Sequence, residues 1–268
     1  MSTCVNCQSE VLGNYCSNCG QRNGVKRLTF REGWNDFWAR IYGFDGMFPR
    51  TLIDLTLRPG KATRKVISGN RVAYYGPVGY FFLMITLMYL VASLLGIDVV
   101  DFMKNSANSG LQGPPPKPGS GQEKFMSELL RLLSDNLKLL SFLLVPILAF
   151  GARFVFFRKS GFNFLEHSIL FFYTQGHVYW LSIISLLSFG MFGKFLPAWI
   201  VMVVSIVYSC YATSDMYHYQ SKIKAMLKGL SLYLMAQLIF IILMIIAVTT
   251  YIILNPEAFE LVRPSNNR

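Results

Sequence analysis

The chain has 268 residues, of which 53% are hydrophobic and only 15% are charged, and its formal net charge is +11. A soluble globular domain carries a larger share of charged residues, so this composition excludes that class and favours a helical membrane protein. The fold class we expect is an all-α membrane protein with five transmembrane helices, interfacial amphipathic helices and a small N-terminal zinc ribbon.

The N-terminal segment contains two CxxC pairs, Cys4/Cys7 and Cys16/Cys19. Each CxxC turn places two thiolates on one side of a tight loop, and two such turns supply four sulfurs at the tetrahedral geometry that suits Zn²⁺. We therefore predict a structural zinc ion in a ribbon over residues 1–24, with no open position for catalysis. A disulfide pair and a redox CxxC are the alternatives, and disulfides would need an oxidising compartment.

The ribbon could dock a protein partner, bind nucleic acid or brace the membrane domain. Single-stranded nucleic acids are bound by basic segments with interleaved aromatic residues. Between the two CxxC pairs Tyr15 is the single aromatic residue. We therefore expect a cytoplasmic protein partner or a bracing role, and no specific nucleic acid.

Residues 25–76 are predicted to form cytoplasmic amphipathic helices at the membrane surface. Trp34 and Trp38 recur four residues apart on an apolar helical face, with arginines on the other face. This pattern is typical of a helix lying in the bilayer interface, where the two tryptophans act as anchors. Packing of the same face against the transmembrane bundle explains the pattern equally well.

Two shorter helices are expected between this segment and the first span. The run over residues 47–57 places five apolar residues on one side, and Pro59-Gly60 is expected to end it. A third helix is expected over residues 61–68. The apolar residues of the first of these helices are Phe48, Leu52, Ile53, Leu55 and Leu57.

Four short segments before the first span form a recognisable set. They are Tyr-Cys-Ser-Asn-Cys-Gly-Gln at residues 15–21, Leu-Arg-Pro-Gly-Lys at 57–61, Ser-Gly-Asn-Arg at 68–71 and the pair Tyr74-Tyr75. Together they resemble bacterial integral membrane proteins that carry an N-terminal zinc ribbon and are classed as a domain of unknown function. The resemblance implies the topology and a cytoplasmic ribbon, and it implies no reaction. A weaker likeness, through Tyr75-Gly76-Pro77, is to the Yip-type five-span membrane proteins associated with trafficking.

Five hydrophobic runs are long enough to cross a bilayer, which takes about 20 helical residues. Lys and Arg dominate the segment before the first run and the turns after the second and fourth. The positive-inside rule then predicts a cytoplasmic N-terminus and an external C-terminus. We expect a multi-pass protein of the bacterial inner membrane, in contact with lipids. The transmembrane domain is expected over residues 77–254, with spans at about 77–97, 137–157, 164–189, 195–214 and 230–254, an external Pro/Gly-rich loop over 98–136 and an external tail over 255–268.

The third span is the richest in polar residues. Glu166 and His177 are eleven residues apart, about three helical turns, and share a face with Tyr173. Ionisable groups within spans are functional candidates, so a small-molecule or ion transporter or channel using this face is the alternative function. Headgroup contacts of Glu166 and interhelical hydrogen bonds of His177 are the structural explanations.

Motifs of common enzyme classes are missing from the sequence. It contains no phosphate-binding GxxxxGK loop, no HExxH helix and no GxSxG elbow. We therefore predict a non-enzymatic protein.

Overall fold

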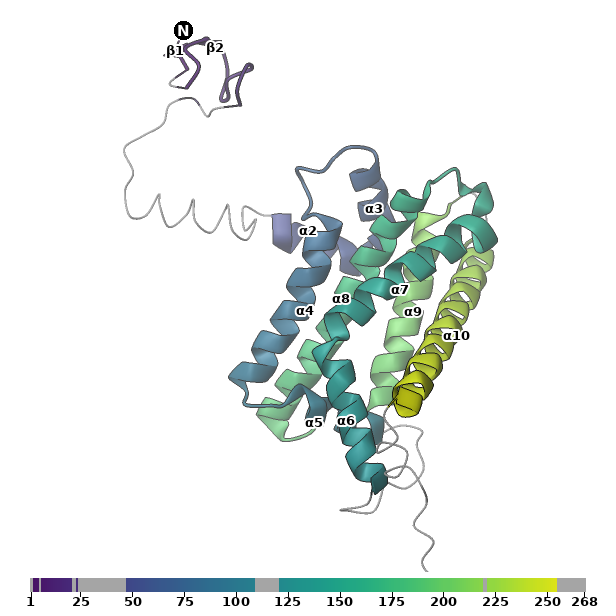
Figure 1. Ribbon diagram of the computed structural model, residues 1–268. Helices are drawn as coiled ribbons and strands as arrows, with labels where there is room; N and C mark the ends of the chain where they lie inside the picture. Colours follow the sequence, from purple (N-terminus) through teal and green to yellow (C-terminus); the bar gives the residue numbers. More distant parts are fainter. Residues whose placement is uncertain are drawn as a thin grey trace, which may run out of the picture. The chain divides into compact units, whose positions relative to one another are not determined.

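The computed structural model describes residues 2–4, 6–20, 23, 47–108, 121–218 and 221–254. The chain divides into two compact units, Met1–Gly46 and Met47–Arg268 (Figure 1). The predicted helix that carries Trp34 and Trp38 lies outside the described residues. The tail over residues 255–268 and part of the Pro/Gly-rich loop, residues 109–120, lie outside them too.

The described part of the first unit is a ribbon with a short antiparallel sheet. Strand β1 (Ser2–Thr3) pairs with β2 (Glu10–Val11), so that Ser2 lies opposite Val11. The two strands flank the first CxxC pair. The buried residues of this ribbon are Cys4, Val11 and Cys16, with Cys7 packed against them. Such a small apolar cluster supplies little folding free energy, so a bound metal ion would have to contribute most of it.

The second unit is an all-α bundle, which confirms the predicted fold class. Within the described residues, five helices are long and apolar enough to cross a membrane. Their order and arrangement can be followed in Figure 1. These helices are α4 (Pro77–Leu94), α7 (Leu137–Gly151) with its π-helical continuation η1 (Ala152–Phe156), α8 (Phe164–Phe192), α9 (Ala198–Met216) and α10 (Lys222–Leu254).

Local sequence explains where several of these helices begin and end. Helix α4 starts with Pro77 in its first turn, where a missing N–H costs nothing. Its end is followed by Gly96 at φ 65°, and α8 is followed by Gly193 at φ 67°, a left-handed conformation that glycine adopts readily. Helix α10 begins at Lys222, eight residues before the expected span at residue 230. Lysine is a good helix former, so the helix can extend beyond the apolar run.

Helix α8 is the centre of the bundle. It packs along α4 and also contacts α7, α9 and the two short helices before the first span, while α10 covers α7 and α9. Gly176 of α8 allows the closest approach, because a Cβ atom at this position would lie 2.9 Å from the Cα atom of Phe81 on α4. The two helices therefore run side by side from this point.

The two short helices before the first span are α2 (Met47–Leu57) and α3 (Pro59–Ile67), and both pack on α8. Helix α2 ends at Leu57, just before Pro59-Gly60, as expected. The expected start of the next helix at residue 61 was wrong, since Pro59 and Gly60 form the first turn of α3. The apolar face expected for α2 was also wrong in part. Ile53 and Leu57 are more than half exposed, whereas Thr51 and Leu55 are fully buried.

Two further helices occupy the segment expected as an external loop. Helix α5 (Val99–Asn108) contacts α6 (Gly121–Asp135), and α6 leads into α7 through Asn136. Tyr89 of α4 connects α6 to the bundle, because its hydroxyl donates a 2.6 Å hydrogen bond to the carbonyl of Ser134 in α6.

Candidate functional site

Glu166 acts as a helix cap in this structure. Its backbone N–H donates to Asn163 Oδ1 at 2.9 Å, and Asn163 N–H donates back to Glu166 Oε2 at 2.7 Å. This capping box satisfies backbone donors at the start of α8. Eleven residues of helix separate Glu166 from His177, about 16 Å along the axis. The structure therefore does not bring these two predicted residues together.

His177 links three helices. Its Nδ1 atom lies 2.8 Å from the Tyr80 hydroxyl of α4, and its Nε2 atom lies 3.1 Å from Thr56 Oγ1 of α2. The Thr56 hydroxyl donates its one hydrogen to the Leu52 carbonyl at 2.8 Å. Thr56 therefore accepts from His177 Nε2–H, and Nδ1 accepts from Tyr80. Both ring nitrogens are satisfied in a neutral imidazole, as expected of a structural residue.

Tyr173 lies one turn before His177 and is fully buried. Its hydroxyl donates a 2.6 Å hydrogen bond to the carbonyl of Tyr75, just before the first span. The Tyr173 ring meets the Tyr80 ring edge to face, with centroids 5.9 Å apart. Tyr173 and His177 thus share one interface with α4.

A second buried histidine closes the end of the bundle near α3. His167 Nδ1 lies 2.6 Å from the Tyr217 hydroxyl, and the Tyr217 ring stacks on Phe157 at 3.8 Å between centroids. Lys228 Nζ lies 5.9 Å from the centroid of the Phe157 ring. The end of η1, the start of α8, the end of α9 and the first turns of α10 therefore meet here.

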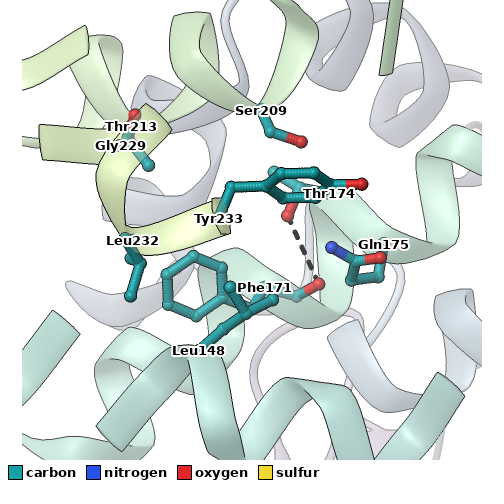
Figure 2. A pocket seen from close by; sticks show the side chains of 9 residues that line it. All are labelled: Leu148, Phe171, Thr174, Gln175, Ser209, Thr213, Gly229, Leu232 and Tyr233. Carbon is teal, nitrogen blue, oxygen red and sulfur yellow. Dashed lines mark hydrogen bonds between the residues drawn. The ribbon is translucent and has the colours of Figure 1, made fainter. Parts of the chain in front are cut away.

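Figure 2 shows a polar cluster where α7, α8, α9 and α10 meet. The cavity between these side chains is only about 10 Å³, which is room for about one water molecule. Thr174 and Thr213 both donate to carbonyls of their own helices, those of Phe171 and Cys210. This cavity gives a solute no route through the bundle. The transport alternative gains no support from it and stays a prediction.

The Leu-Arg-Pro-Gly-Lys segment, residues 57–61, holds α3 against the end of α9. Gly60 lies directly on the backbone of Asp215 and Met216, where an added Cβ atom would overlap main-chain atoms. The backbone N–H of Lys61 donates to Asp215 Oδ2 at 2.9 Å. Arg64 Nη1 donates to the Met216 carbonyl at 2.9 Å and also contacts that of Asp215. Arg64 thus satisfies carbonyls that a helix end leaves without partners.

The side of α9 adds two hydrogen bonds to the same junction. The Tyr208 hydroxyl donates to the Leu55 carbonyl at 3.1 Å, and the Tyr211 hydroxyl donates to the Leu57 carbonyl at 2.6 Å. These carbonyls belong to the last turn of α2, which otherwise leaves them open. The basic segment before the first span is therefore a packed part of the membrane unit.

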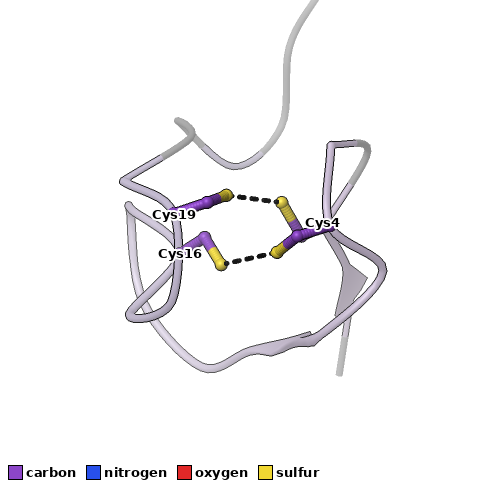
Figure 3. Close-up of side chains that lie close together, drawn as sticks. Cys4, Cys16 and Cys19 are labelled. Atoms are coloured by element: carbon purple, nitrogen blue, oxygen red, sulfur yellow. Dashed lines mark hydrogen bonds between the residues drawn. The ribbon is translucent and has the colours of Figure 1, made fainter.

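The four N-terminal cysteines form a compact thiol cluster. Their Sγ atoms all lie within 4.8 Å of one another, with 3.5 Å between Cys4 and Cys19 and 3.5 Å between Cys7 and Cys16. Figure 3 shows Cys16 and Cys19 on one side of the cluster and Cys4 on the other. A tetrahedral ion with bonds of about 2.3 Å to sulfur separates its ligands by about 3.8 Å. The four sulfurs therefore fit a metal ion, and the predicted site is present as a possible metal site.

Both CxxC turns close in the same way. Gln8 has φ 59° and Gly20 has φ 73°, and each follows the second cysteine of its pair. The Gln8 N–H donates to the Cys4 carbonyl at 3.0 Å, and the Gly20 N–H donates to the Cys16 carbonyl at 2.9 Å. The two turns are thus equivalent although only one has a glycine. Gln8 accepts a backbone conformation that side chains normally disfavour.

Ser9 is a member of the cluster that the CxxC spacing alone does not reveal. Its Oγ atom lies 2.9 Å from Cys7 Sγ and 3.2 Å from Cys16 Sγ. The hydrogen bond from the Ser9 side chain, helped by its backbone N–H, lowers the pKa of Cys7 to about 6. The same hydroxyl is the largest cause of the lowered pKa of Cys16, and its single hydrogen can be donated to one of the two sulfurs at a time. Thiolate is the form that binds metal, so Ser9 favours ligation.

The helices and the thiol cluster together define an all-α membrane-type protein with a small N-terminal four-cysteine module. Residues 45–89 match the model of a family described as "Protein of unknown function (DUF3667)". The match includes the Leu-Arg-Pro-Gly-Lys segment and confirms the resemblance to a family of unknown function over this part of the chain. No curated protein and no solved structure matches the chain. The bacterial origin and the likeness to Yip-type proteins stay predictions.

Proposed function

We propose that the protein is a non-enzymatic integral membrane protein of the bacterial inner membrane, whose N-terminal ribbon binds structural zinc in the cytoplasm and docks a protein partner. The thiol cluster carries this proposal, because four Sγ atoms within 4.8 Å match a tetrahedral Zn²⁺ site. Four sulfurs fill the coordination sphere, so the ion would hold the fold of the ribbon and would leave no position for a substrate.

The charge of the membrane unit supports a cytoplasmic ribbon. Three basic segments lie at one end of the bundle: helix α3, the turn after η1 and the first turn of α10. Cationic turns mark the cytoplasmic side of a span, and thiols stay reduced there. Five spans then give an external C-terminus.

Exposed apolar side chains on the ribbon favour docking over a purely bracing role. Leu12 is 86% exposed and Tyr15 is 63% exposed, and both lie between the two CxxC pairs. An exposed tyrosine and an exposed leucine on so small a module are typical of a protein contact. The partner we propose is a cytoplasmic protein that covers these two side chains.

The test compares three forms of the full-length protein purified from membranes in mild detergent. Leu12→Ala/Tyr15→Ala should keep its zinc but lose a co-purifying protein, which is then identified by mass spectrometry and rebound in purified form. Cys4→Ser/Cys7→Ser should lose both zinc and partner. Asn18→Ala, at an exposed polar position of the same ribbon, should lose neither. Partner binding that survives the first two variants would contradict docking through the ribbon.

A further inference from the structure

A second cavity, of about 390 Å³, lies where α2, α8 and α9 meet. This volume falls within the range of small-molecule sites, about 300–1,000 Å³. A dry cavity of about 150 Å³ binds benzene, so this one accommodates on the order of fifteen carbon atoms. Most of its wall is apolar, formed by Leu52, Val178, Trp180, Leu181, Ile184 and Val204.

The cavity opens sideways from the bundle. Ile184 and Val204 belong to its wall, yet they are 47% and 42% exposed. Both residues lie on helices long and apolar enough to span a membrane. Exposed apolar side chains on such helices face hydrocarbon, so a ligand would enter from the lipid.

One end of the cavity is polar, and that end lies near the start of the first span. Thr56, His177 and Tyr208 line it. Gly176, next to His177, touches Phe81, which is four residues after α4 begins at Pro77. Ile184 lies seven residues further along α8, about 10 Å deeper. A ligand with a polar head at the edge of the hydrocarbon and a chain directed inward would match this order.

The polar end offers hydrogen-bond acceptors. The Thr56 hydroxyl gives its hydrogen to Leu52 and accepts from His177, which leaves one lone pair. The Tyr208 hydroxyl gives its hydrogen to the Leu55 carbonyl, which leaves both lone pairs. The Trp180 indole nitrogen lines no open space, because it is completely covered. A head group must therefore donate a hydrogen bond here.

The lining also selects against charge. Among the nine residues that form the wall none is an Asp, Glu, Lys or Arg, and both ring nitrogens of His177 already have hydrogen-bond partners in the neutral imidazole. An ionised head group would lose its hydration without gaining a counter-charge. We propose that this cavity binds a neutral long-chain lipid with a free hydroxyl group, which donates to the Tyr208 hydroxyl oxygen while the chain fills the apolar part. Binding of this lipid does not depend on the zinc ribbon.

The test uses Trp180, which lies in the cavity wall, as a reporter. The full-length protein with Trp34, Trp38 and Trp199 replaced by phenylalanine is placed in phosphatidylcholine nanodiscs. A long-chain alcohol brominated in mid-chain should quench Trp180 with saturation. Its methyl ether and the matching carboxylate should bind roughly tenfold more weakly, because the first lacks the donor and the second is charged.

Two matched pairs of variants locate the site. Val204→Phe fills the cavity and should abolish saturable quenching, whereas Val203→Phe, equally exposed on α9 but outside the wall, should not. Tyr208→Phe and Tyr211→Phe each remove one hydrogen bond from α9 to α2. Only Tyr208→Phe should reduce the preference for alcohol over ether.

Several outcomes would overturn the proposal. Quenching that rises in proportion to bilayer content, equally for alcohol and ether, would show that the cavity only exchanges bulk lipid chains. Equal loss in Val203→Phe and Val204→Phe would place the binding elsewhere. If Tyr208→Phe kept the same preference for the alcohol over the ether as Tyr211→Phe, the head group would not bind Tyr208.

Discussion

The glycine of the Leu-Arg-Pro-Gly-Lys segment gives a sharp test of how the chain before the first span is held. In Gly60→Ala the new methyl group would overlap the backbone of Asp215 and Met216. Helix α3 must then move away from α9, which costs about 1–3 kcal/mol in overpacking. The shift also breaks the hydrogen bond from Lys61 N–H to the Asp215 carboxylate, worth about 1.5–3 kcal/mol.

Together these losses amount to about 2.5–6 kcal/mol, or a fall in Tm on the order of 10 °C for a unit of this size. The assay is thermal unfolding of the full-length protein in detergent, with tryptic cleavage after Arg64 as a second readout. Gly76→Ala is the control, because this glycine has open space around its Cα and an ordinary φ of −58°. A Gly60→Ala protein that melts within about 2 °C of this control would refute the packing described for α3.

Two further predictions concern the bundle and the ribbon. His177→Phe should lower the stability by about 1–3 kcal/mol, because the buried Tyr80 hydroxyl loses its partner, and Tyr80→Phe should restore part of this loss in the double variant. Thermal unfolding of the four proteins measures the coupling, and strictly additive losses would contradict it. Gly20→Val should weaken zinc binding about 5- to 30-fold, because valine must adopt φ 73° at a cost of about 1–2 kcal/mol, while Gly13→Ala should not. Competition with a chelator measures the zinc affinity of both variants, and a Gly20→Val affinity equal to that of Gly13→Ala would argue against this turn geometry.

The fold class could be predicted from the sequence because its determinants are local. Long hydrophobic runs mark the spans, and Pro77, Gly96 and Gly193 mark helix ends within a few residues. The thiol cluster was predictable for the same reason, since a CxxC turn fixes its own geometry. The contact of Ser9 with the sulfurs could not be predicted, because a serine next to a CxxC pair can equally well face solvent or bond to the backbone.

Contacts between distant residues could not be predicted. Proline and glycine are common both after one helix and in the first turn of the next. The start of α3 at Pro59 is held by a contact of Lys61 with Asp215, which lies 154 residues further along the chain. The apolar face of α2 was wrong in part because the contacts of α2 with α3 and α8 decide which of its residues are buried, and these contacts leave Ile53 and Leu57 exposed. The hydrogen bonds of His177 could not be predicted because its partners, Thr56 and Tyr80, are on other helices.

Zinc content measured on the purified full-length protein is the most direct test of the central claim. We expect one zinc ion per chain by mass spectrometry of the metal, lost in Cys4→Ser/Cys7→Ser. Cys210→Ser should keep the ion, since this buried cysteine lies on α9 in the membrane unit. Protein that carries no zinc, with its four N-terminal cysteines joined in disulfides, would contradict both the metal site and the reducing side of the membrane assigned to it.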